Sequence, residues 1–167
     1  MKRRPFLPQI TLALASAALG LSLASPALAQ TTDHSHGAAD AHTLSLNNGK
    51  KWSTDAPLRQ SMTRIRALVA PKIDAAHAGK LRAADYQALA RQTEAQIGVI
   101  VKECKLEPQA DEALHIVIAR MGESLEVMNG KSSAGKPVDG LLHLAEAVND
   151  YGAHFEHPGF KPIALRH

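Results

Sequence analysis

The side chains best suited to chemistry in this sequence are one thiol and several imidazoles. Cys104 is the only cysteine of the chain, and His115 follows it in the stretch VIVKECKLEPQADEALH. Thiolate and neutral imidazole are ligands that copper, nickel and zinc accept. A single cysteine cannot form an internal disulfide, so Cys104 must be buried, bound to a metal or paired between chains.

A second group of histidines lies near the N-terminus. His34, His36 and His42 stand beside Asp33 and Asp40 in a stretch that begins DHSH. Imidazoles with a nearby carboxylate suit a transition metal ion such as copper, nickel or zinc. The stretch has little apolar content, so residues 30–50 are predicted to form a flexible, disordered tail. A plain linker without metal is the alternative.

The first 29 residues have the features of a cleaved export signal. Basic residues 2–4 precede the apolar run ITLALASAALGLSLA, and Ala27 and Ala29 form an A-x-A pattern before Gln30. This pattern predicts cleavage before Gln30, and the apolar run is short for a membrane span. We therefore expect a periplasmic protein whose mature chain has no membrane span.

Composition argues against nucleic acid as a partner. The predicted cleavage removes three of the nineteen Lys and Arg and none of the sixteen Asp and Glu, so the formal net charge falls from +3 to zero. The chain holds three Phe, two Tyr and one Trp. Such a chain offers neither a stripe of cations that could follow phosphates nor a set of rings on which bases could stack.

Four segments of the mature chain place apolar residues at helical spacing. The first carries Leu58, Met62, Ile65 and Val69, and Pro71 should kink or interrupt it. Short connections between four helices imply an all-α, antiparallel up-down-up-down four-helix bundle. We expect the bundle over residues 51–160 and a C-terminal tail over 161–167. The first predicted helical segment lies within 53–80, before a turn at AGKL, and the other three are about 83–104, 109–128 and 138–155.

That topology would place several candidate ligands in one half of the bundle. They are Met62, Cys104, His115, His154 and His157. At about 1.5 Å per residue, His115 should lie roughly 9 Å into its helix while Cys104 ends another, so a direct contact is not expected. A metal site would need His154 or Met62 to complete it. The competing interpretation is that the thiol and the thioether only fill the core.

Motifs of common enzymes are missing from the sequence. It has no GxGxxG after a strand, no P-loop, no HExxH and no GxSxG, and no CxxCH that could attach haem covalently. A reactive thiol needs an accessible setting that stabilises the thiolate, whereas Cys104 continues an apolar stripe. We expect a protein that acts by binding and is not an enzyme.

Two resemblances bear on these expectations. The blocks KKWSTDAPLRQSMTRIR, IVKECKLEPQADEALHIVIARM and NDYGAHFEHPGF resemble small exported bacterial proteins labelled DnrO-like, a label that implies no particular activity. The chain is also similar, more weakly, to soluble b-type cytochrome bundles, a resemblance that implies haem held by a methionine at Met62 and a late histidine. Gly152 stands where that histidine is expected, which argues against haem.

The leading hypothesis is an exported binding protein for a transition metal. The competing one is a cofactor-free interaction or structural module, with a protein partner as its ligand. Binding of b-type haem comes third.

Overall fold

The structure, a computed structural model, describes residues 43–165, and this part of the chain is helical without a β-strand. Two isolated bridges, Asn47 with Lys50 and Trp52 with Phe155, are its only extended pairings. The all-α prediction is therefore confirmed for residues 43–165. The predicted signal over 1–29 and the imidazoles of His34, His36 and His42 lie outside the described residues.

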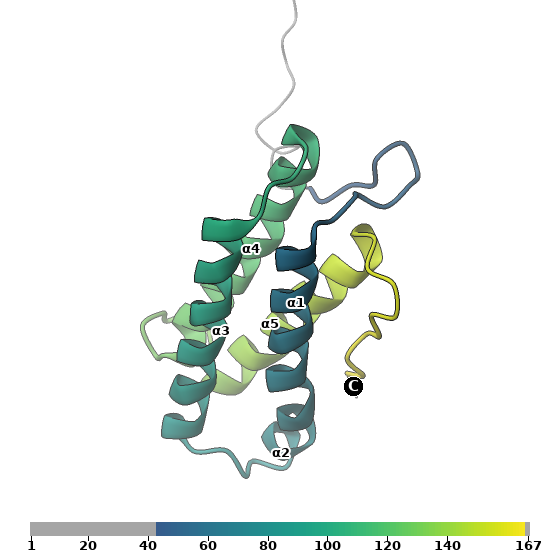
Figure 1. The fold of residues 1–167 in the computed structure, drawn as a ribbon. Coiled ribbons are helices and arrows are strands. Elements are labelled where there is room, and N and C mark those ends of the chain that lie inside the picture. Colours follow the sequence, from purple (N-terminus) through teal and green to yellow (C-terminus); the bar gives the residue numbers. More distant parts are fainter. Residues whose placement is uncertain (1–42, 166–167) are drawn as a thin grey trace, which may run out of the picture. The chain divides into compact units, whose positions relative to one another are not determined.

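The long helices match the segments predicted from apolar spacing to within a few residues (Figure 1). Pro71 lies in a short 3-10 turn that interrupts the first helix, as its missing N–H and its ring require. The elements are α1 (Ala56–Val69), η2 (Ala70–Lys72), α2 (Ile73–His77), α3 (Ala83–Glu103), α4 (Pro108–Met128) and α5 (Pro137–His154).

Capping side chains and prolines mark the starts of several helices. Asp55 caps α1 by accepting a hydrogen bond from the Leu58 N–H, and a proline stands in the first turn of α1, α4 and α5. Asp139 accepts from the Lys136 N–H before α5, at 2.7 Å. These local signals explain why the starts of these helices can be predicted from the sequence.

One hydrophobic core joins the helices. Contacts are most extensive between α4 and α5 and between α1 and α3, with smaller contacts from α1 to α5 and from α3 to α4. The apolar stripe predicted on α1 is fully buried. The largest fully buried side chains include Tyr151, Phe155, Leu58, Met62, Ile65, Leu114, Met121 and Leu144.

Gly140 lets α4 and α5 approach closely. A Cβ at this position would lie 2.8 Å from the Ser124 carbonyl oxygen and 2.9 Å from the Met128 nitrogen, both backbone atoms of α4. Gly122, inside α4, has open space where its Cβ would stand. Only the first of these glycines is required by packing.

The N-terminal boundary predicted for the helical domain needs correction. Leu44 packs against the core, and the Trp52 indole N–H donates to the Ser45 carbonyl at 2.7 Å. The Trp52 backbone donates to the His154 carbonyl and accepts from the Glu156 N–H, both at 2.8 Å. Residues 43–50, which composition assigns to a disordered tail, therefore belong to the folded unit.

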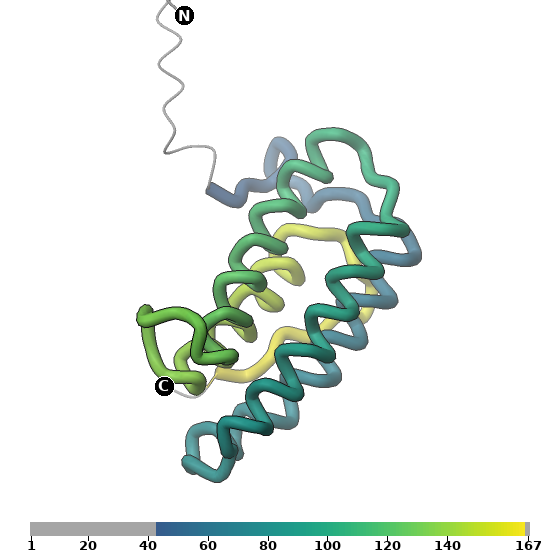
Figure 2. The backbone as a smooth tube through the Cα atoms, turned by 90° about the vertical axis from the view of Figure 1, so that its left-hand side faces the viewer, coloured from purple at the N-terminus to yellow at the C-terminus, as the bar shows by residue number. Residues whose placement is uncertain are grey.

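The C-terminal boundary predicted for the helical domain also differs from the structure. The last segment, yellow in Figure 2, turns back after α5 and runs beside α1 and α5. Ile163 is buried, and its backbone N–H and carbonyl both pair with the Asn149 side chain, at 2.7 and 2.9 Å. Residues 161–165 are thus packed and do not form the predicted tail.

No helix among the described residues combines the length and the apolar character that crossing a bilayer demands.

Candidate functional site

Cys104 lies at the C-terminal cap of α3 with its thiol half-buried and free. Burial, together with the neighbouring Asp55 carboxylate, raises the pKa of the thiol to about 12. The group is therefore protonated at neutral pH, and a protonated thiol is neither a nucleophile nor a metal ligand until it loses its proton. Cys104 lies where the apolar stripe of α3 ends, and its protonated thiol is unreactive at neutral pH.

Asp55 connects two parts of the chain that are distant in sequence. One carboxylate oxygen accepts from the Leu58 N–H at 2.9 Å, and the other accepts from the Lys105 N–H at 2.7 Å. The first bond caps α1 and the second holds the turn between α3 and α4 against it. Because both donors meet an ionised acceptor, these are bonds of the stronger kind.

His157 follows α5 and pairs with a buried tyrosine. Tyr151 is 0% exposed, and its hydroxyl lies 2.9 Å from Nδ1 of His157. Burial raises the pKa of Tyr151 far above its ordinary value, so the hydroxyl keeps its proton, and the direction of the hydrogen bond depends on the tautomer of the ring. The other ring nitrogen, Nε2, lies 3.4 Å from the Thr63 hydroxyl.

The imidazole of His157 is neutral at pH 7. Burial and the nearby Arg59 guanidinium lower its pKa below the ordinary value of 6.5. Its ring also packs against Phe160, with centroids 4.8 Å apart. His157 is thus held in one orientation by Tyr151 and Phe160, with Nε2 toward Thr63 of α1.

A groove beside His157 separates α1 from the C-terminal segment. Its first hollow has a volume of about 420 Å³ and its second about 270 Å³, and the two share Thr63, His157 and Pro158. We call both together the His157 groove. No Asp or Glu of residues 43–165 lines it. The remaining lining residues are Arg59, Gln60 and Arg64 in the first hollow, and Arg66, Ala67, Gly159, Phe160 and Lys161 in the second.

The polar groups of the His157 groove are mainly donors. Arg59, Thr63 and Arg66 recur at helical spacing on one face of α1. One terminal nitrogen of Arg59 donates to the Thr54 carbonyl and hydroxyl at 2.5 and 2.9 Å, which orients the guanidinium. A guanidinium presents several N–H groups in a fixed plane, a geometry that suits oxyanions. The arrangement can hold an anion.

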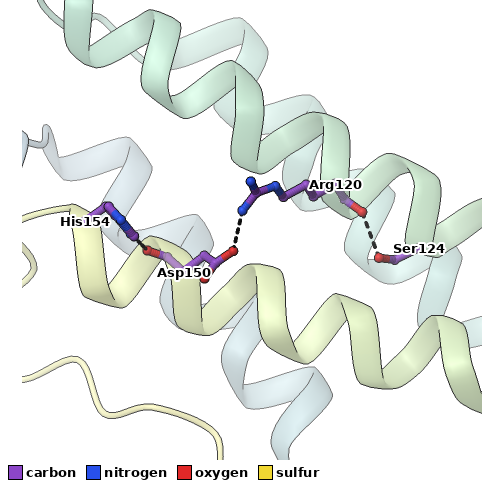
Figure 3. A network of polar contacts seen from close by, with 4 residues as sticks. All are labelled: Arg120, Ser124, Asp150 and His154. Carbon is purple, nitrogen blue, oxygen red and sulfur yellow. Dashed lines mark hydrogen bonds and ion pairs between the residues drawn. The ribbon is translucent and has the colours of Figure 1, made fainter. Parts of the chain in front are cut away.

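The other predicted ligands do not converge on one place. Met62 is fully buried in the core. The Nδ1 atoms of His115 and His154 each contact the carbonyl oxygen four residues earlier, at 2.8 Å, and must donate to it, which leaves Nε2 as the acceptor of a neutral ring. His154 stands next to Asp150, which pairs with Arg120 of α4 at 2.6 Å (Figure 3).

Within residues 43–165 no three His, Cys, Asp or Glu side chains form a group that could hold a metal ion. Cys104, His115 and His154 are therefore not assembled into such a site. Ligation by the imidazoles of residues 34, 36 and 42 stays a prediction, because those residues lie outside the described part.

The residues present do not fit the haem site that the cytochrome resemblance implies. A Cβ at Gly152 would lie 2.7 Å from Cδ1 of Phe160. The Phe160 ring therefore fills the space that a ligating side chain at this position would need. The glycine is explained by packing, and haem held between Met62 and residue 152 is incompatible with this arrangement.

Sequence reasoning grouped His157 with Met62 and Cys104 and did not connect it with Tyr151, Phe160 or Arg59. The cations at helical spacing on α1 were the available signal; the histidine that completes the groove comes from a segment about a hundred residues away. Comparison with known proteins adds no further clue, since no family model, curated protein or solved structure matches the chain.

Proposed function

We propose that this chain is an exported binding protein, built as an up-down-up-down bundle of four antiparallel helices, that binds a small anion in the His157 groove. Export rests on the predicted signal over residues 1–29. One observation supports the anion above all: the groove combines the guanidinium groups of Arg59 and Arg64 with a neutral His157, and no carboxylate of residues 43–165 lines it.

The groove chemistry explains how an anion would be held. Arg59 is partly buried and oriented by Thr54, whereas Arg64 is exposed. In the tautomer that carries its proton on Nε2, the neutral His157 ring donates a hydrogen bond to the anion, and the Thr63 hydroxyl adds a second donor. Since exposed charges are screened by ions over about 10 Å at 0.1 M salt, binding should weaken as ionic strength rises.

The experiment is a titration of the mature protein with inorganic phosphate, followed by amide chemical shifts. Shifts should centre on Thr63 and His157, and Arg64→Gln should weaken binding severalfold. Arg91→Gln is the matched control, because Arg91 is an exposed helical arginine on α3 that lines neither hollow of the groove. Equal affinities of the two variants, or shifts confined to other surfaces, would contradict the proposal.

Metal binding is the second candidate, and the DHSH stretch favours it. His34, His36 and His42 would bind copper, nickel or zinc as neutral imidazoles, so affinity should fall as pH drops through about 6.5. The test compares metal content and absorption of the mature chain with those of a chain that begins at residue 43. Equal metal content of the two chains would contradict metal binding by His34, His36 and His42.

A cofactor-free interaction module is the remaining alternative. It predicts that neither phosphate nor a transition metal binds the purified protein, and that a protein partner does. The two titrations above therefore separate this class from the other two.

A further inference from the structure

The His157 groove is lined by apolar residues as well as by cations. The apolar residues are Ala67, Pro158 and Phe160. Phe160 is fixed in place, because its ring rests on Gly152 and meets the Tyr151 ring edge-on at a centroid distance of 5.3 Å. A ligand that is only an anion would leave these apolar residues in contact with water.

Both hollows carry cations, but the Phe160 ring lines only the second. Arg59 and Arg64 line the first hollow, and Arg66 and Lys161 line the second beside Phe160 and Ala67. A molecule that combines an acidic group with an apolar ring would match this lining.

We infer that the ligand class is an aromatic carboxylate, with its carboxylate between Arg59, Arg64 and His157 and its ring over Pro158 and Phe160. This inference rests on the proposed anion-binding function and names its ligand. A ring is favoured over an aliphatic chain because Phe160 and His157 already form an aromatic cluster, to which a further ring can add by edge or offset contact.

The test compares benzoate with acetate, two carboxylates of equal charge that differ by the ring. Benzoate should bind the mature protein about tenfold more tightly, which corresponds to about 1.4 kcal/mol. Phe160→Leu should remove most of that advantage and leave acetate binding unchanged. Because Phe160 also packs on Gly152, circular dichroism of the variant must match that of the original chain.

A second variant avoids the packed ring. Ala67 is exposed on α1, so Ala67→Leu should fold normally and narrow only the second hollow. It should weaken benzoate severalfold and leave acetate unaffected. Arg64→Gln, by contrast, should weaken both ligands alike.

The outcomes separate the two levels of the hypothesis. If acetate and benzoate bind equally and Arg64→Gln weakens both, the anion groove stands and the aromatic inference is overturned. If benzoate binds more tightly but neither Phe160→Leu nor Ala67→Leu changes it, the ring lies elsewhere and the inference is again overturned. If no anion binds, the proposed function itself fails.

Discussion

Replacing Asp55 with alanine tests whether one carboxylate holds the Cys104 end of the protein together. The substitution removes the cap of α1 and the acceptor for the Lys105 N–H, bonds of 2.9 and 2.7 Å. An N-cap contributes about 1 kcal/mol, and a hydrogen bond to a charged group about 1.5–3 kcal/mol. Because Lys105 is exposed, water will replace part of the second bond. We expect Asp55→Ala to lower the free energy of unfolding by about 2–3 kcal/mol.

Asp139→Ala is the matched control. Its carboxylate accepts only from the Lys136 N–H, three residues away, so it closes the start of its own helix and joins no distant segment. The control should cost about 1 kcal/mol or less. Urea unfolding of both variants, followed by circular dichroism, measures the difference.

Thiol chemistry gives a second measurement on the same variant. The Asp55 carboxylate is one cause of the raised pKa of Cys104, so its removal should lower that pKa toward the ordinary value of 9.0. Alkylation of the folded variant at about pH 9 should then be faster than in the original chain. Equal unfolding free energies for Asp55→Ala and Asp139→Ala, with an unchanged alkylation rate, would refute the assigned role of Asp55.

Four further outcomes are expected. Gly140→Ala should lower the unfolding free energy by about 1–3 kcal/mol because its Cβ meets the α4 backbone, whereas Gly122→Ala, in open space, should raise it by up to about 1 kcal/mol; urea midpoints compare them. The folded-state pKa of His157 lies below 6.5, so its contribution to stability is complete above about pH 6.5 and is lost as pH falls below it; His157→Gln should flatten the slope of urea midpoint against pH. Cys104 in the folded protein should react slowly with iodoacetamide at pH 7, and a rate equal to that of a free thiol would contradict its raised pKa. Mass spectrometry of periplasmic material should find Gln30 at the N-terminus, and an intact signal would contradict the export prediction.

Local patterns were sufficient for the helices. The recurrence of Leu58, Met62, Ile65 and Val69 at intervals of three and four predicted a buried face of α1, and all four are 0% exposed. Pro71 predicted the interruption of that helix. Such signals act between residues within one or two turns, so they can be read without knowing the partners.

The domain ends and the candidate site depended on distant contacts. Composition gave no reason to expect residues 43–50 to be ordered, yet the Ser45 carbonyl accepts from the Trp52 indole, and Trp52 itself pairs with His154 and Glu156 across about a hundred residues. The predicted set of Cys104, His115, His154 and Met62 followed from assumed helix heights. Height along a bundle does not specify which way a side chain faces, and in the structure two of the imidazoles bond to their own helices.

The sequence by itself determined the helical class, the faces that each helix buries and the residues that begin and end the helices, because these follow from periodicity and capping within a short stretch. Only the tertiary structure decided that Tyr151 orients His157 toward α1, that Asp55 meets Lys105, and that Gly152 is a glycine because Phe160 packs on it. Each of these contacts needs the segments to be positioned first. The physical reason is that helical periodicity specifies how much of a face is buried, whereas the partner against which it packs depends on the folding of the whole chain.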